Sequence, residues 1–158
     1  MRTLGILLTA SLLLAGCATV PMAGAGADAE GKRFDPPPPG RSALYVYRSS
    51  MLGTESIFNI ADNQQPVGAL ADKTWIRVDV APGPHVIACS IPSHAPLTQD
   101  PAQTATVTLA PGETRFVEAV IWPGLPLNPR CRTTEVAADQ GRAAVAAGTR
   151  AMGAGWSN

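Results

Sequence analysis

Two turns in the sequence share the same chemistry, Ala81-Pro82-Gly83 and Ala110-Pro111-Gly112, and each lies between two segments in which apolar and polar side chains alternate. An alternation with a period of two is typical of a half-buried β-strand, and proline followed by glycine favours a reversal of the chain. The segment Thr74–Val80 alternates in this way, with Ile76, Val78 and Val80 on one side and Trp75, Arg77 and Asp79 on the other. We therefore predict two hairpins whose strands have one face towards the core and the other towards solvent.

Further segments rich in β-branched and aromatic residues bring the total to about seven or eight short strands. They are ALYVYR (43–48), SIFNIAD (56–62), PVGAL (66–70), HVIACSI (85–91), TATVTLA (104–110), TRFVEAVIW (114–122) and CRTTEV (131–136). Because no helical period separates them, the sequence predicts an all-β fold, an antiparallel β-sandwich over residues 42–136. The tail, residues 137–158, mixes helix-forming alanines with glycines. We expect a short C-terminal helix around Val136 to Met152, with fraying ends.

The N-terminal stretch has the composition of an export signal. Arg2 supplies a positive charge, and Leu4 to Leu14 form an apolar stretch too short to span a bilayer. The residues Leu14-Ala15-Gly16-Cys17 resemble the lipobox of bacterial lipoproteins. The resemblance implies removal of residues 1–16 as a signal peptide, diacylation of the Cys17 thiol and acylation of the new amino terminus, for example by palmitate. A plain signal peptide with a coincidental cysteine is the alternative.

The same resemblance predicts an address in the cell. Three acyl chains on Cys17 would form an effectively permanent membrane anchor. Ala18, and not an aspartate, follows the cysteine, which resembles lipoproteins sent to the outer membrane of Gram-negative cells. We therefore expect a protein of the bacterial cell envelope, anchored by lipid in the outer membrane and facing the periplasm.

Residues 17–41 connect the lipidated cysteine to the first strand and are rich in Ala, Gly and Pro. A segment with so few large apolar side chains buries too little surface to offset the entropy of ordering it, so we expect a flexible tether. Its four prolines, Pro36–Pro39, favour a semi-rigid polyproline spacer. A ligand for a proline-reading partner is the alternative for these prolines.

Once Cys17 is assigned to lipid, the cysteines that remain are Cys89 and Cys131. An even number in an oxidising compartment favours a disulfide, and two buried unpaired thiols are the alternative. Zinc is disfavoured because neither cysteine has a second ligand at close spacing. The 12 Lys and Arg residues balance the 12 Asp and Glu residues and are scattered along the chain, so no nucleic-acid surface is indicated. No cofactor is expected, since the glycines form no phosphate-binding or dinucleotide motif.

Several stretches together suggest a family. ALYVYR, IFNIADNQQPVGAL, VDVAPGPHVIA, LAPGETRFVEAVI and the Gly-Arg-containing tail resemble small bacterial lipoproteins that share a domain of unknown function. The resemblance covers roughly Ser42 to Arg150 and extends to β-sandwiches of the PEGA-like and carboxypeptidase-regulatory-like kind. It implies a fold and no catalytic residues. Asn63-Gln64 stands where the family's turn usually has a glycine, so the turn type is expected to differ.

The residues that could carry chemistry are few. A metal site would require His85, His94 and Asp100 to converge, and surface histidines are the simpler interpretation. A catalytic triad could be drawn from Ser90 or Ser93 with His94 and Asp100, but no nucleophile elbow accompanies them. We therefore expect no metal, no catalytic residue and no enzymatic activity.

Two tryptophans and one arginine are candidate ligand-binding residues. Trp75 shares a strand face with Arg77, and Trp122 begins a proline-stiffened loop. An exposed aromatic ring beside charged groups can receive a sugar, a peptide or a partner protein. The alternative is structural: Trp75 packs under the tail, and Trp122 caps the open end of the sandwich.

These observations lead to a functional hypothesis. The chain is expected to be a lipid-anchored, non-catalytic binding or scaffolding module, attached to the membrane by its lipid and presenting loops or an edge strand to another envelope protein. Binding of glycan, in particular peptidoglycan, through exposed tryptophans is the alternative. An envelope hydrolase is a third hypothesis that would require a pocket with perturbed titratable groups.

Overall fold

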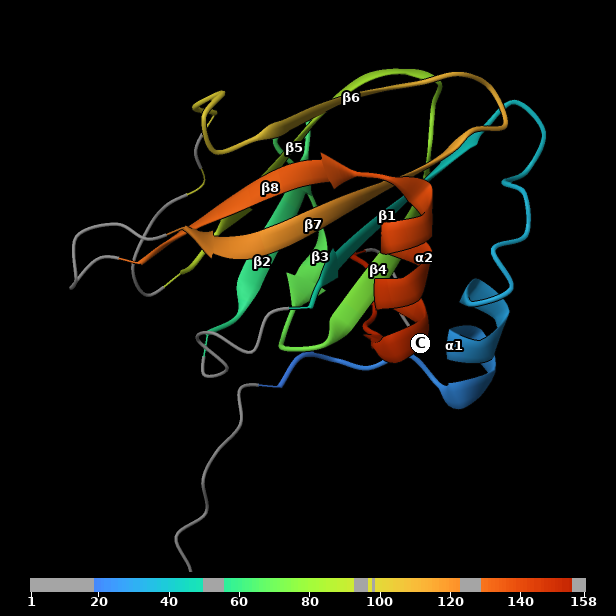
Figure 1. Cartoon of the computed structure of the whole chain (residues 1–158), viewed down its shortest axis with the longest axis horizontal. Coiled ribbons are helices and arrows are strands. Elements are labelled where there is room, and N and C mark those ends of the chain that lie inside the picture. The colour runs from blue at the N-terminus through green and yellow to red at the C-terminus, as the bar shows by residue number, and fades with distance from the viewer. Residues whose placement is uncertain (1–18, 50–55, 93–96, 98, 123–128, 155–158) are drawn as a thin grey trace, which may run out of the picture.

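The computed structural model describes residues 19–49, 56–92, 97, 99–122 and 129–154. Its elements are α1 (Ala25–Gly31), β1 (Ser42–Arg48), β2 (Phe58–Asp62), β3 (Gln65–Leu70), β4 (Thr74–Val80), β5 (Gly83–Ser90), β6 (Ala105–Leu109), β7 (Thr114–Trp122), β8 (Arg130–Val136), α2 (Ala138–Ala147) and β9 (Thr149–Arg150). The strands form a five-stranded sheet in the order β8-β7-β1-β4-β9 and a four-stranded sheet in the order β3-β2-β5-β6 (Figure 1). The predicted all-β sandwich with a short C-terminal helix is confirmed. The expected signal peptide lies outside the described residues.

Neighbouring strands are antiparallel with two exceptions, because β1 pairs with β7 and β4 pairs with β9 in parallel. Parallel neighbours require a crossover connection. The four-stranded sheet provides one for β1 and β7, because between these two strands the chain passes through β2 and β3, returns to β4, and then passes through β5 and β6. The parallel pairs thus follow from the way the chain alternates between the two sheets.

The two Ala-Pro-Gly turns are corners between the sheets and not hairpins within one sheet. The first joins β4 to β5 and the second joins β6 to β7, and in each case the two strands belong to different sheets. Gly83 and Gly112 have φ angles of 132° and 79°, which glycine adopts without the steric cost that a Cβ would bring. The hairpin prediction is wrong here because a proline-glycine turn reverses the chain without determining which sheet receives the next strand.

A true hairpin joins β2 to β3 at the turn Asn63-Gln64. Both residues have positive φ, 47° and 69°, as the two central residues of a type I′ turn require. Asparagine tolerates this conformation, and the Asn63 side chain accepts a hydrogen bond of 3.0 Å from the amide of Val86 on β5. The side chain therefore supports a turn that usually contains glycine.

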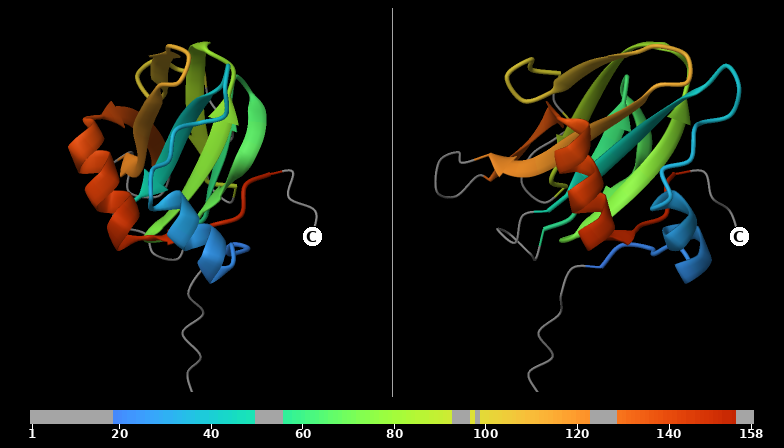
Figure 2. Two further views of the ribbon diagram at one scale, coloured as in Figure 1. Left: turned by 90° about the vertical axis from the view of Figure 1, so that its right-hand side faces the viewer. Right: turned by 45° about the vertical axis from the view of Figure 1, so that its right-hand side comes forward.

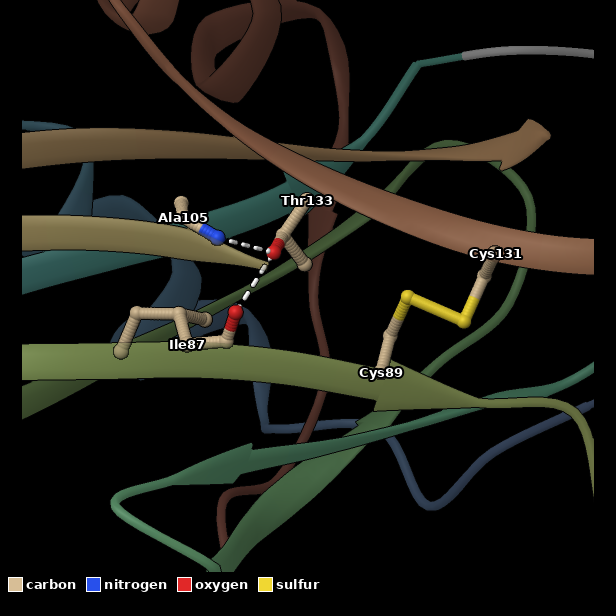
Figure 3. Close-up of a disulfide and its surroundings, with 5 residues drawn as sticks. All are labelled: Ile87, Cys89, Ala105, Cys131 and Thr133. Carbon is tan, nitrogen blue, oxygen red and sulfur yellow. Dashed lines mark hydrogen bonds between the residues drawn. A yellow bond between two sulfur atoms is a disulfide. The ribbon is translucent and has the colours of Figure 1, made fainter. Parts of the chain in front are cut away.

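The space between the sheets is filled mainly by aliphatic side chains. Its buried members are Val20, Leu44, Val46, Phe58, Ile60, Leu70, Ala71, Ile76, Val80, Ile87, Cys89, Ile91, Ala105, Val107, Leu109, Val117, Ala119, Cys131 and Ala151. Cys89 on β5 and Cys131 on β8 form a disulfide between the two sheets, with their Cα atoms 5.9 Å apart (Figure 3). The predicted disulfide is confirmed, and it links the sheets through the core.

The outer face of the five-stranded sheet is also buried, which corrects the expectation that it faces solvent. All seven residues of β1 are buried. A second cluster of Ala43, Tyr45, Tyr47, Trp75, Phe116 and Val145 lies between this face and the helices. Figure 2 shows α2 lying against the sheet on the side away from the four-stranded sheet. The alternation of residues in β4 is real, but helices cover the face that the pattern assigns to solvent.

Glycines allow the helices to approach the aromatic rings. A Cβ atom on Gly31 of α1 would lie 2.2 Å from the Trp75 ring, and one on Gly141 of α2 would lie 2.3 Å from the Phe116 ring. Such distances are too short for any side chain larger than hydrogen. Both helices therefore dock through bare backbone, and this explains how glycine-rich segments become ordered.

The segment expected to be a flexible tether is packed on the domain wherever the structure describes it, from residue 19 to residue 41. Val20 is 7% exposed and belongs to the inner core. The amide of Ala23 donates to the carbonyl of Arg150 (2.9 Å), and the amide of Met152 donates to the carbonyl of Pro21 (2.8 Å). The tether prediction is wrong because backbone pairing and glycine contacts stabilise a segment that has few large side chains.

The C-terminal tail forms a shorter helix than expected and then a strand. α2 ends at Ala147, and Gly148 is extended with φ −97° and ψ −174°. β9 then pairs with β4, and Ala151 forms an isolated bridge with Met22 and Gly153 one with Gly68. The described part of the tail, which ends at Ala154, is thus held by pairing to both sheets and to the N-terminal segment.

Candidate functional site

A cleft of about 660 Å³ opens beside the outer face of the five-stranded sheet. Pro36–Pro39 and the end of α1 line it on the N-terminal side, and β4 and β9 contribute Arg77 and Arg150. The prolines favour an extended, stiff backbone, so they form a firm wall and not the free spacer that we expected. The cleft is therefore built by two segments at opposite ends of the chain.

Arg77 is the predicted ligand-binding residue that the structure places in this cleft. Its side chain is 12% exposed, and its Nε donates to Oδ1 of Asp79 at 3.1 Å. The guanidinium carbon lies 5.7 Å from the centre of the Tyr45 ring, within the range of a cation–π contact. These contacts hold the guanidinium in one place at the base of the cleft.

Tyr45 supports this arrangement from below. Burial raises the pKa of its hydroxyl, an effect that the nearby Arg77 charge opposes. The phenol is thus neutral at ordinary pH, and its hydroxyl donates to the carbonyl of Gly31 at 2.8 Å. One tyrosine therefore connects the arginine of the cleft to the helix that forms its wall.

Arg150 contributes a second guanidinium that sequence reasoning did not identify. It lies next to Trp75 in the parallel pairing of β9 with β4, and its guanidinium carbon is 5.5 Å from the centre of the Trp75 ring. One terminal nitrogen donates to the carbonyl of Ala27 at 3.0 Å. The position depends on the pairing of a two-residue strand, which leaves no periodic signal in the sequence.

The cleft has charges of both signs. Glu30, Asp35 and Asp79 also line it, but Arg33 pairs with the first two, at 4.0 Å and 2.9 Å. Further N–H groups of Arg77 and Arg150 form no hydrogen bond with the described residues. Guanidinium groups bind carboxylate and phosphate through charge-assisted hydrogen bonds. The arrangement can therefore hold an anionic group near the two arginines, whereas each carboxylate that lines the cleft is already paired with an arginine.

Trp75 is not available to a ligand, which corrects its assignment as a candidate binding residue. Its side chain is fully buried, and it lies between Gly31 on one side and Gly148 and Arg150 on another. The structural alternative, in which Trp75 packs under the tail, is the one observed. A large ring on this face is buried because both helical segments offer glycine against it.

Trp122 lies at the end of β7, half-buried, on the outer face of the sheet. The guanidinium carbon of Arg132 on β8 is 3.9 Å from the centre of its ring. One face of the indole is thus already occupied by a cation, and the loop at residues 123–128 lies outside the described residues. Trp122 does not share the cleft of Arg77, so the structure separates the candidate residues into two regions.

His85 on β5 is a structural residue that connects the end of β2 to the turn before β5. Its Nδ1 lies 2.7 Å from Oδ2 of Asp62 and its Nε2 lies 2.8 Å from the carbonyl oxygen of Ala81. Both ring nitrogens are thus occupied by protein oxygen atoms, and neither points to open space where a metal ion could bind. Within the described ranges no group of three potential metal ligands is found. His94 and Ser93 lie outside the described residues.

The remaining candidates for chemistry have structural contacts. The Asp100 carboxylate accepts from the Ala102 amide at 2.9 Å and from the Gln103 side chain at 2.8 Å, and the amide contact lowers its pKa. Ser90 is buried, at 8% exposure. Asp100 thus has the contacts of a turn residue, and Ser90 those of a buried strand residue. Neither gives support to the Ser-His-Asp triad considered from the sequence.

The comparisons with known proteins identify a similar protein but assign no activity to it. No family model matches the chain, and no solved structure matches it. A protein of Haemophilus influenzae described as uncharacterized is 33% identical over 78 residues, a match that covers 49% of this chain and 46% of the relative. The chain thus spans about half the length of that protein. Among the residues searched, no helix is both long and apolar enough to cross a membrane.

Proposed function

We propose that this protein is a lipid-anchored bacterial cell-envelope protein that acts as a non-catalytic binding module. The proposed anchor is Cys17, on the grounds of the Leu14-Ala15-Gly16-Cys17 lipobox. The disulfide between Cys89 and Cys131 supports an oxidising compartment outside the cytosol. A relative in a bacterium supports a bacterial origin. The proposed location is the outer membrane, facing the periplasm, on the grounds of Ala18.

The cleft is the proposed binding site, and the observation that carries this proposal is the pair of guanidinium groups in it. Arg77 and Arg150 are each held by backbone or ring contacts and each retain N–H groups that the described residues do not use. A preorganised donor loses little entropy when a ligand binds. We propose a ligand with a carboxylate group, such as a peptide segment of an envelope protein or the stem peptide of peptidoglycan.

Capture of a partner through an edge strand is the weaker form of the same hypothesis. At one side of the sandwich, Thr133 on β8 donates to the carbonyl of Ile87 at 2.6 Å and accepts from the amide of Ala105 at 2.9 Å. At the other side, Gly153 bridges to Gly68 on β3. Both open sides of the sandwich are therefore partly occupied by the chain itself, and the cleft is the more accessible surface.

Binding of a glycan through Trp122 remains the second candidate. The ring is half-buried at the end of β7, and Arg132 stacks on it, so a sugar could lie against the exposed part of the ring. This candidate no longer includes Trp75. The two candidates predict different residues: Arg77 and Arg150 for a carboxylate ligand, and Trp122 for a sugar ring.

A cross-linking experiment in cells separates them. Full-length wild type is compared with an Arg77→Gln, Arg150→Gln double variant, with Trp122→Ala, and with Arg115→Gln as a matched control. Arg115 is a suitable control because it pairs with Glu113 and Glu135 away from the cleft. We expect the double variant to lose its cross-linked peptide or muropeptide by at least about tenfold, the effect of 1.4 kcal/mol, while the control retains it. Retention in the double variant with loss in Trp122→Ala would instead favour the glycan site.

The anchor is tested in the same cells by mass spectrometry and by partition into detergent. We expect the mature wild-type chain to begin at an acylated Cys17 and to enter the detergent phase. We expect a Cys17→Ser variant to remain in the aqueous phase, since it cannot carry the thioether-linked lipid. A wild-type chain without acyl groups would refute the proposed anchor.

A further inference from the structure

The docked N-terminal segment places the proposed lipid very near the folded domain. Val20 is 7% exposed and packs in the inner core, and Cys17 precedes it by only three residues. Three extended residues span at most about 11 Å. The domain therefore has no long spacer between itself and the position where acyl chains would enter a membrane.

This distance is comparable with the thickness of the lipid headgroup layer. The hydrocarbon core of a bilayer is about 30 Å thick and the whole bilayer about 40 to 45 Å, so each headgroup layer is about 5 to 8 Å thick. A Cys17 whose acyl chains enter the hydrocarbon lies at its boundary. Val20 would then lie only a few ångströms beyond the headgroups, and the surface around it must meet the leaflet.

The surface around this segment is apolar. Among the described residues, the exposed large hydrophobic side chains are Met22, at 42%, and Leu97, at 39%. Pro21 and Leu97 line a hollow of about 620 Å³, and Met22 lines a second one of about 220 Å³. Met152 borders both hollows. None of the described residues that line the larger hollow is ionisable.

The position of this surface in the fold agrees with the short distance between Cys17 and Val20. Figures 1 and 2 show the N-terminal segment at the lower end of the molecule and β6 at the upper end, in views related by rotation about the vertical axis. Pro21, Leu97 and Met152 line one hollow, and Met22 and Met152 line the other, so the apolar surface adjoins the segment by which the chain enters the domain. Isolated exposed apolar side chains are common, but here they adjoin two mainly apolar hollows, the smaller of which Arg150 also lines, and the proposed anchor.

We propose that Pro21, Met22, Leu97 and Met152 form a membrane-contact face that rests on the lipid leaflet into which the acyl chains of Cys17 insert. The inference rests on the proposed lipidation of Cys17. It assigns the domain one orientation on the membrane. Because Gly153 lines both the cleft and the two hollows, it also places the cleft beside the leaflet, where a ligand close to the membrane surface would be reached.

The test uses the full-length lipidated protein with one added cysteine that carries an environment-sensitive fluorophore. Met22→Cys and Leu97→Cys report on the proposed face. Thr108→Cys is the matched control, because Thr108 is exposed on β6. The proteins are reconstituted in vesicles of phosphatidylethanolamine and phosphatidylglycerol with and without a nitroxide-labelled lipid. We expect a blue-shifted emission and several-fold stronger quenching at positions 22 and 97 than at position 108.

The outcomes separate this inference from the proposed function. The mass of the same samples shows whether Cys17 is acylated. If the protein is acylated but the probes at positions 22 and 97 report an aqueous environment, the proposed membrane-contact face is wrong and the proposed anchor stands. Equal quenching at all three positions leads to the same conclusion. A protein without acyl chains overturns both. Two independent positions on the face ensure that misfolding of one variant, checked by its thermal unfolding, does not prevent a decision.

Discussion

The inner face of the five-stranded sheet packs against a second sheet through mainly aliphatic side chains, whereas its outer face packs against helices through aromatic rings. On the inner face, side chains from both sheets fill the space and a disulfide crosses it. On the outer face, Tyr45 and Phe116 stack with ring centres 5.2 Å apart, and the helices offer glycine backbone. The inner face should therefore be sensitive to the loss of atoms or bonds, and the outer face to added atoms.

The largest expected effect tests the covalent link of the inner face. A Cys89→Ala, Cys131→Ala double variant should lower the free energy of unfolding by about 4 kcal/mol in the chain-entropy model, because the disulfide closes a loop with a sequence separation of 42. Denaturant unfolding measures the change, and wild type treated with a reductant is the control. A change below about 1 kcal/mol would show that the sheets are held together without the bond.

The outer face is tested by adding a single methyl group. Gly141→Ala should lower the free energy of unfolding by about 2 to 3 kcal/mol, since its Cβ would collide with Phe116. Gly26→Ala is the matched control, because Gly26 lies in α1 with no atom within 4 Å of the added Cβ. The control should be neutral or gain up to about 1 kcal/mol through helix propensity. Equal effects of the two substitutions would contradict contact through glycine.

A hydrogen-bond link between the sheets should have a smaller effect. Thr133→Val keeps the shape of the side chain but removes the hydroxyl that contacts Ile87 and Ala105 (Figure 3). We expect a loss of about 1 to 2 kcal/mol, because buried backbone groups lose their partner. Thr134→Val, at an exposed neighbouring position, should change the unfolding free energy by less than about 0.5 kcal/mol. Amide exchange of Ala105 provides a local measurement, and unchanged protection would argue against the link.

The smallest effect concerns the outer aromatic cluster at high pH. Burial, and then the Glu118 charge, raise the pKa of Tyr47 from 10.0 to about 12. Below pH 10 the hydroxyl is protonated in both the folded and the unfolded chain, and its contribution to stability is complete. As the pH rises from about 10 to about 12, only the unfolded chain ionises, so stability is lost across this window. Tyr47→Phe should make the decline shallower in an alkaline unfolding series, and an unchanged slope would contradict this assignment.

The strands and the disulfide could be predicted from the sequence because their signals are local. Alternation in Thr74–Val80 is visible within the segment itself, and the pairing of Cys89 with Cys131 follows from the number of cysteines and the expected compartment, so neither needs knowledge of the packing. The covering of the outer face could not be predicted, because Gly31 and Gly141 have the appearance of helix-weakening residues until their contacts with rings are known. Only one of the two arginines of the cleft could be predicted from the sequence. Arg77 lies on a strand whose residues alternate clearly, whereas Arg150 is positioned by a short parallel pairing.

The pairing of the two ends of the chain also implies an order of events during folding. The amide of Ala23 bonds to the carbonyl of Arg150, and the Arg150 amide bonds to Asp28. The N-terminal segment therefore lacks its binding partners until almost the whole chain has emerged, and such distant contacts form late because closing a long loop is costly. Docking of residues 19–41 onto the domain is therefore expected to be a late step of folding, because it joins segments more than 100 residues apart.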